Sequence, residues 1–93
     1  MLDETNYKID ENNSLLILDD DQPFLKRLSV AMEKRGFNVF PASSMAEFSR
    51  ILENGCPNYA IVDLRLSDGI GLDAVEGIRN VNPKSKIVVL TGY

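Results

Sequence analysis

The sequence predicts an α/β domain built on a doubly wound parallel sheet. Short apolar runs of the kind found in buried strands alternate with segments whose apolar residues recur at helical spacing. Two of these runs, residues 15–18 and 60–62, are followed directly by aspartate, and open parallel sheets bind ligands beyond such carboxyl ends. Seven alternating elements, joined by right-handed crossovers, put helices on both faces of a mainly parallel sheet.

The first strand is expected at residues 15–18, with a helix after it. Pro23 suits the first helical turn, because the N–H that proline lacks would have no intrahelical partner there. Apolar residues then recur at helical spacing, namely Phe24, Leu25, Leu28, Ala31 and Met32. We expect Gly36 to end this helix and residues 37–40 to form a short second strand.

A second helix is expected to begin near Ser44. Ser44 and Glu47 have the spacing of a capping box, in which the side chain of each residue accepts a hydrogen bond from the backbone N–H of the other. The apolar residues of this helix are Phe48, Ile51 and Leu52. Gly55 and Pro57 are expected to end it, and residues 59–64 to form the third strand.

A loop is expected after the third strand. It contains Ser67, Asp68, Gly69 and Gly71. The two glycines lack the full spacing of a dinucleotide-binding motif, so we interpret them as loop geometry. A third helix is marked by Leu72, Val75 and Ile78 and ends at Asn82 and Pro83, after which residues 86–90 form a fourth strand.

The composition fits one small domain with an acidic tail. The 93 residues are 44% hydrophobic and 26% charged, which is ordinary for a globular protein. Residues 1–13 carry a net charge of −3 out of a total of −4, so we expect them to be a flexible tail and residues 14–93 to be the domain. The domain has no basic stripe, and this argues against nucleic-acid binding by this chain alone.

The cysteine and histidine content excludes several kinds of chemistry. Cys56 is the only cysteine and histidine is absent, so the sequence excludes disulfide frameworks, thiolate-rich zinc sites and Cys/His catalysis. We interpret Cys56 as an inert small residue. The start lacks the features of a signal peptide, and no apolar run approaches the length of a membrane span, so we expect a cytoplasmic protein without membrane contact.

Four aspartates follow the first and third strands. Asp19, Asp20 and Asp21 come directly after the first strand, and Asp63 lies near the end of the third. Clustered carboxylates repel one another, so we expect a hard divalent cation such as Mg²⁺ to bind among them. Asp21 is more simply the cap of the helix that begins at Pro23, whereas Asp19 and Asp20 are expected to bind the metal.

This arrangement has the parts that phosphoryl transfer needs. Asp63 is placed to be the nucleophile, and Asp19 and Asp20 are placed to hold Mg²⁺ directly or through water. The backbone carbonyl of Arg65 completes the predicted metal site. Thr91, at another strand end, offers a hydroxyl to a phosphoryl oxygen, although a threonine in such a place is also typical of an ordinary loop.

Three motifs resemble one known family. They are Leu-Leu-Ile-Leu-Asp-Asp-Asp at 15–21, Ile-Val-Asp-Leu-Arg-Leu at 61–66 and Ile-Val-Val-Leu-Thr-Gly at 87–92. Together they resemble the receiver domain of bacterial two-component response regulators. The stretch Val-Asp-Leu-Arg-Leu-Ser-Asp-Gly-Ile-Gly-Leu at 62–72 looks closer still to the global redox regulators of the RegA/PrrA/ActR type.

The resemblance implies a role for each residue of the acidic cluster. Asp63 matches the phosphoacceptor. Asp20, Asp63 and the carbonyl of Arg65 match direct Mg²⁺ ligands, and Asp19 matches a ligand that acts through water. Thr91 matches the switch hydroxyl. The resemblance also implies a sensor histidine kinase as phosphoryl donor and, beyond self-phosphorylation and autodephosphorylation, no enzymatic activity.

The resemblance further implies a CheY-like, flavodoxin-like fold with strand order 2-1-3-4-5. We expect the chain to be a truncated receiver that lacks the last strand and the last two helices, and Ser67 stands where many receivers have proline. Without these elements the strand at 86–90 becomes a sheet edge and one sheet face is uncovered. We therefore expect self-association through this strand and face, with DNA bound only by an absent output domain.

Three functions remain open from the sequence. The first is a phosphoacceptor receiver that controls transcription through that output. The second is an interaction module that works without phosphorylation, in which case loss of Asp63 leaves partner binding unchanged. The third is a Mg²⁺-dependent aspartyl phosphohydrolase, which is disfavoured because Arg65 occupies the position where such enzymes usually have a second aspartate.

Overall fold

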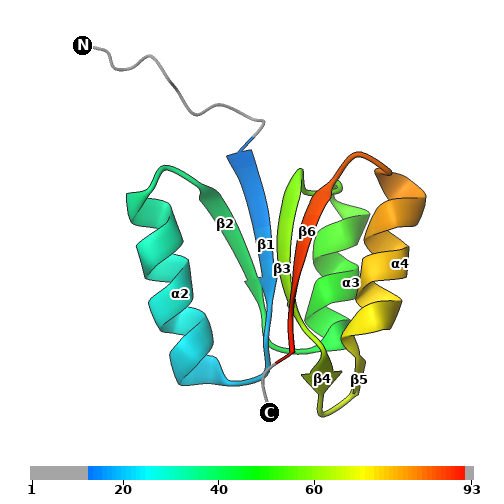
Figure 1. Cartoon of the computed structure of the whole chain (residues 1–93), viewed down its shortest axis with the longest axis horizontal. Coiled ribbons are helices and arrows are strands. Elements are labelled where there is room, and N and C mark those ends of the chain that lie inside the picture. Colours follow the sequence, from blue (N-terminus) through cyan, green and yellow to red (C-terminus); the bar gives the residue numbers. More distant parts are fainter. Residues whose placement is uncertain (1–12, 92–93) are drawn as a thin grey trace.

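The computed structural model describes residues 13–91 and contains a four-stranded parallel sheet (Figure 1). The strands are β1 (Ser14–Leu18), β2 (Asn38–Ala42), β3 (Tyr59–Asp63) and β6 (Lys86–Leu90). Their order in the sheet is β2-β1-β3-β6, which matches the first four positions of the predicted order 2-1-3-4-5. The predicted fold class is therefore confirmed. Apart from Asn13, the predicted acidic tail at 1–13 lies outside the described residues.

Helices cover the sheet on both faces, as predicted for a doubly wound fold. Helix α2 (Gln22–Lys34) packs on one face, and α3 (Met45–Glu53) and α4 (Gly71–Val81) pack on the other (Figure 1). No helix in the described part of the chain is long and apolar enough to cross a membrane.

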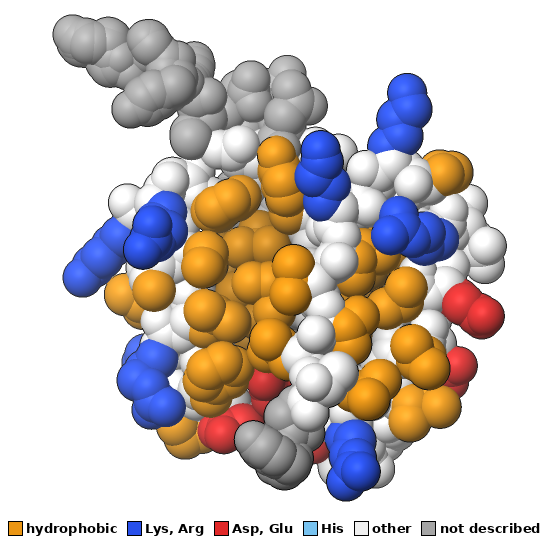
Figure 2. Space-filling view, viewed as in Figure 1, with side chains coloured by type: hydrophobic (Ala, Val, Ile, Leu, Met, Phe, Trp, Pro, Cys, Tyr) orange, Lys and Arg blue, Asp and Glu red, His pale blue; other side chains and the backbone are white. Residues whose placement is uncertain are grey.

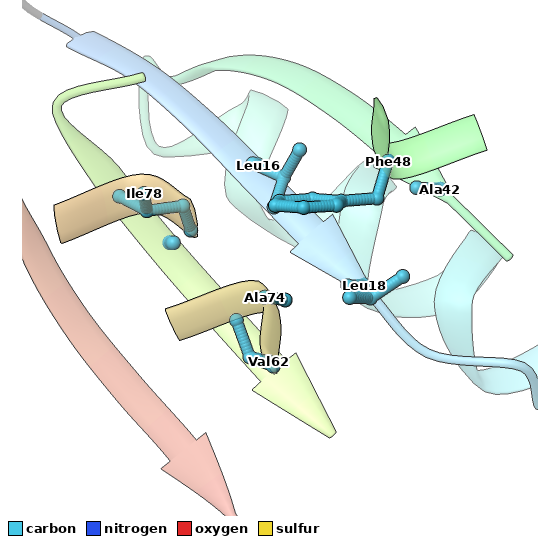
Figure 3. Close-up of a cluster of buried hydrophobic side chains, with 8 residues drawn as sticks. Leu16, Leu18, Ala42, Phe48, Val62, Ala74 and Ile78 are labelled. Carbon is cyan, nitrogen blue, oxygen red and sulfur yellow. The ribbon is translucent and has the colours of Figure 1, made fainter. Parts of the chain in front are cut away.

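The larger core lies between the sheet and α3 and α4. Its centre consists of Leu16 and Leu18 from β1, Val62 from β3, Phe48 from α3 and Ile78 from α4 (Figure 3). Each of these side chains is at least 97% buried. Because successive residues of a strand face opposite ways, Leu15 and Ile17 point to the other face and meet Leu25 of α2.

Local sequence signals set the helix starts. The Asp21 side chain accepts a hydrogen bond from the Phe24 N–H and caps α2, as predicted. Ser44 Oγ accepts from the Glu47 N–H and caps α3. The second half of the predicted capping box differs, because the Glu47 carboxylate accepts from the N–H and hydroxyl of Ser43 rather than from the Ser44 N–H.

Several predicted element boundaries are wrong. The second strand spans Asn38–Ala42 instead of 37–40, and the third ends at Asp63 rather than at residue 64. The segment interpreted as a loop contains a short antiparallel hairpin of β4 (Arg65–Leu66) and β5 (Gly69–Ile70). The two residues that flank the hairpin are also joined, because the Gly71 N–H donates to the Leu64 carbonyl.

One half of the α2 face is uncovered in the described residues. Helix α2 packs mainly against β2 and β1, so the half of this sheet face that β3 and β6 form lies largely outside the area that α2 covers. Figure 2 shows hydrophobic side chains gathered over the central strands in this view. Val88 of β6, which lies opposite Ile61 of β3, is 56% exposed.

Candidate functional site

The first two acids of the site follow β1. The Asp19 N–H donates to the Ala42 carbonyl at 3.0 Å, so pairing with β2 continues one residue past the strand and fixes the Asp19 backbone. The Asp19 side chain is 6% exposed, and its Oδ1 accepts from the Asp21 N–H at 2.9 Å. Asp20, the next residue, is exposed.

Sheet register brings Asp63 to the same place. Leu18 of β1 lies opposite Val62 of β3, so Asp19 and Asp63 are the next residues on adjacent parallel strands. Carboxylate oxygens of Asp19, Asp20 and Asp63 all lie within 4.8 Å of one another. The structure therefore brings together the three carboxylates that were predicted to meet.

The electrostatics of this cluster are unfavourable without a cation. Burial raises the pKa of the Asp19 carboxyl, the bond from the Asp21 N–H opposes that rise, and the nearby charges of Asp63, Asp20 and Asp21 raise the pKa further. A raised pKa means that the folded protein resists ionisation of this group. Three converging carboxylates match the all-oxygen ligands that Mg²⁺ prefers, so these residues fit the predicted metal.

The β4–β5 hairpin borders the acidic cluster. The Ser67 N–H donates to Asp20 Oδ2 at 2.9 Å and so joins the turn of the hairpin to the loop after β1. Arg65, whose carbonyl is the fourth predicted metal ligand, lies in β4 of the same hairpin, and its side chain is exposed. The hairpin thus contributes both a backbone donor and a candidate backbone ligand.

Thr91 follows the end of β6. Leu90 lies opposite Asp63 in the β3–β6 register, so Thr91 is one residue beyond the position level with the predicted phosphoacceptor. Thr91 is exposed. A strand-end hydroxyl and a strand-end carboxylate are therefore on neighbouring strands at the same edge of the sheet.

Sequence reasoning missed two residues near the site. Gly71 was interpreted as loop geometry, but it is buried and begins α4 directly against Asp63, where a side chain would overlap the Asp63 carbonyl oxygen. Asp68 was placed only in a loop, but its carboxylate accepts from the Met45 N–H at the start of α3. The adjacent Asp68-Gly69 pair, a common turn sequence, was the available signal for the hairpin.

The structure is a parallel α/β sheet with three carboxylates gathered at the carboxyl edge of its strands. Residues 15–93 match the response regulator receiver domain. The chain belongs to this family.

Close relatives are regulatory proteins. Over 90 residues the chain is 57% identical to the photosynthetic apparatus regulatory protein RegA of Rhodovulum sulfidophilum, with 97% of this chain and 49% of that protein covered. Over 85 residues it is 51% identical to the acid tolerance regulatory protein ActR of Rhizobium meliloti, with 91% and 44% covered. The chain therefore spans about half the length of these relatives, and its resemblance to the RegA and ActR regulators is confirmed.

Solved structures of receivers share the fold. A response regulator from Burkholderia pseudomallei, solved with a phosphorylated aspartic acid, calcium ion and citrate, is 30% identical with a TM-score of 0.81, covering 87% of this chain and 48% of that one. A CheY-like receiver domain from Methanospirillum hungatei is 31% identical with the same TM-score, covering 87% and 65%. The predicted receiver fold is confirmed.

Proposed function

We propose that this chain is the phosphoacceptor receiver of a two-component response regulator, with Asp63 as the acceptor and Mg²⁺ as the cofactor. The observation that supports this most strongly is the convergence of Asp19, Asp20 and Asp63 within 4.8 Å in a member of the receiver family. The proposed metal ligands are these three carboxylates, with Asp19 acting through water, and the backbone carbonyl of Arg65. The solved relative from Burkholderia pseudomallei, whose description includes a phosphorylated aspartic acid and a calcium ion, gives further support.

The proposed chemistry is transfer to a carboxylate. A side-chain oxygen of Asp63 attacks the phosphorus of a kinase phosphohistidine, and the new P–O bond forms as the P–N bond breaks and its electron pair returns to the imidazole. A bound Mg²⁺ supplies positive charge that offsets the phosphoryl oxygens. Asp63 is half-buried and its backbone is held in β3, which limits the directions from which a phosphoryl group reaches it.

Thr91 is the proposed switch residue. Its hydroxyl donates a hydrogen bond to a phosphoryl oxygen on Asp63, and this contact exists only in the phosphorylated state. A group that interacts with only one of two conformations shifts the population toward that conformation. Thr91 directly follows β6, so its movement changes the surface at the carboxyl end of that strand.

The proposed partners follow from the relatives. The donor is a sensor histidine kinase in the cytoplasm. The RegA and ActR relatives are named as regulatory proteins and are about twice as long as the matched region. The proposed output is transcription control by a DNA-binding part that lies outside this chain, and phosphorylation of Asp63 controls it.

Self-association is the proposed behaviour of this chain in isolation. Among the described residues, β6 pairs with β3 on one side and has no strand on the other. Edge strands with free backbone groups pair readily with a second strand. A second copy that pairs its own β6 there satisfies the free backbone groups and places its apolar side chains beside the exposed Val88.

Intact-mass spectrometry tests the proposed function. The chain is incubated with acetyl phosphate, a small-molecule phosphoryl donor, and Mg²⁺, beside an Asp63→Asn variant and a sample with a chelator. The proposal expects one added phosphoryl group that requires both Asp63 and the metal. A folded chain that gains no phosphoryl group would contradict it and favour the phosphorylation-independent interaction module.

A further inference from the structure

The turn of the β4–β5 hairpin contacts two distant parts of the chain. On one side, the Ser67 N–H donates to Asp20 Oδ2 at 2.9 Å. On the other, the Asp68 carboxylate accepts from the Met45 N–H, with distances of 3.0 and 3.1 Å to its two oxygens. The turn therefore links the acidic cluster after β1 to the first residue of α3.

The contact with α3 has clear physical causes. The first N–H groups of a helix have no intrahelical partner. Ser44 Oγ satisfies the Glu47 N–H, and Asp68 satisfies that of Met45. A carboxylate beside a helix N-terminus is also favoured by the helix dipole. Gly69 allows the close approach, because a Cβ atom there would lie 2.8 Å from Met45 Cγ.

The hairpin needs such an anchor. Its strands have two residues each, and a hairpin of this size has little stability of its own. Leu66 packs against the main core on one side. The Asp68–Met45 hydrogen bond is a further attachment, and it comes from the turn itself, next to the N–H that orients the exposed Asp20.

We propose that Asp68 is a positioning residue for the metal-binding cluster. By fastening the turn to α3, Asp68 fixes the Ser67 N–H that orients Asp20, together with the hairpin that carries the Arg65 carbonyl. This inference rests on the proposed function, because it concerns the same Mg²⁺ site. According to this proposal, Asp68 influences the affinity of the carboxylate cluster for Mg²⁺ although it is exposed and lies outside that cluster.

Three variants of the 93-residue chain test the proposal. Asp68→Ala removes the hydrogen bond to Met45. Asp68→Asn removes the same negative charge but keeps a side-chain oxygen that accepts from the Met45 N–H. Ser44→Ala removes a different cap from the same helix and leaves the hairpin contact intact. Mg²⁺ affinity is measured by titration calorimetry, and the opening of the turn by hydrogen exchange at the Ser67 amide.

The expected results distinguish the effect of the hydrogen bond on Mg²⁺ affinity from the effects of the lost charge and of reduced helix stability. Asp68→Ala should weaken Mg²⁺ binding roughly tenfold, the low end for losing support outside the ligand set. It should also speed Ser67 amide exchange. Asp68→Asn and Ser44→Ala should both stay within about twofold of wild type. Gly69→Ala, which pushes against Met45, should act in the same direction as Asp68→Ala and gives a second route if that variant folds poorly.

Other outcomes overturn the inference. If Asp68→Ala binds Mg²⁺ as tightly as wild type, Asp68 does not position the site. If Asp68→Asn is as weak as Asp68→Ala, the effect is one of charge. If Ser44→Ala binds Mg²⁺ as weakly as Asp68→Ala, the effect is one of helix stability. These three outcomes leave the proposed phosphorylation of Asp63 unaffected. A wild-type chain that neither binds Mg²⁺ nor accepts a phosphoryl group would overturn the proposed function as well.

Discussion

Gly71 packs directly against the backbone of Asp63. A Cβ atom at Gly71 would overlap the Asp63 carbonyl oxygen and would lie 2.9 Å from Val62 Cγ1. The Gly71 N–H also donates to the Leu64 carbonyl at 2.8 Å. The start of α4 therefore packs so closely on the end of β3 that no side chain fits at position 71 against the backbone of the proposed phosphoacceptor.

Replacing Gly71 by alanine should therefore destabilise the protein. The added methyl meets rigid backbone, and overpacking of this kind costs about 1–3 kcal/mol. Gly77→Ala is the matched control in the same helix, because its Cβ would lie 3.6 Å or more from its neighbours, an ordinary contact distance. Alanine inside a helix is favoured over glycine by roughly 0.5–1 kcal/mol, so Gly77→Ala should stabilise. Urea unfolding measures both, and equal effects would contradict the close packing.

Asp19→Asn should raise the free energy of unfolding in the absence of metal at neutral pH. The raised pKa of Asp19 indicates that ionising this buried group opposes folding, and asparagine keeps the oxygen that accepts from the Asp21 N–H. Mg²⁺ at a hundredfold excess over its Kd should stabilise wild type by about 2.7 kcal/mol and the variant by less. Urea unfolding with and without Mg²⁺ measures this. A variant that responds fully to the metal would argue against Asp19 as a ligand.

Glu47 should make stability depend on pH. Hydrogen bonds from the N–H and then the hydroxyl of Ser43 lower the pKa of Glu47 below the ordinary glutamate value of 4.5, against a smaller opposing effect of burial. The stabilisation is therefore present above pH 4.5 and is lost as the pH falls through the lowered folded-state pKa. Glu47→Gln should lose this part of the acid dependence, whereas Glu53→Gln, at the other end of α3, should keep it. Unfolding measured across the acid range decides between them.

Self-association should depend on Val88. Light scattering coupled to size-exclusion chromatography should give a wild-type mass that rises with concentration, and Val88→Lys should shift the chain to monomer because lysine blocks edge pairing. Leu72→Lys is the matched control, since Leu72 on α4 is 54% exposed against 56% for Val88 but lies away from the sheet edge. Equal masses for wild type and Val88→Lys at every concentration would rule out this interface.

Much of the site could be predicted from sequence because it depends on strand ends. Once two neighbouring parallel strands are assigned, sheet register alone brings Asp19 and Asp63 together. The Asp21 cap is equally local, since Pro23 marks the helix start two residues later. The metal ligand roles and the task of Thr91 remain predictions.

The wrong boundaries arise from tertiary contacts. The second strand was expected to end at residue 40, but β2 continues through Pro41, which an edge strand tolerates because a missing N–H on the outer side costs little. The hairpin was interpreted as a loop because its anchors, Asp20 and Met45, are far from Ser67 and Asp68 in sequence. Gly71 was missed for the same reason, because the need for glycine arises only where α4 meets β3.

Locating the phosphoryl group tests the central claim most directly. After reaction with acetyl phosphate and Mg²⁺, borohydride reduces an aspartyl phosphate to homoserine, and peptide mass spectrometry identifies the converted residue. The proposed function predicts homoserine at position 63 alone, with conversion lost when Mg²⁺ is chelated. Conversion at Asp19 or Asp20, or none in a folded chain, would contradict the assignment of Asp63 as the phosphoacceptor.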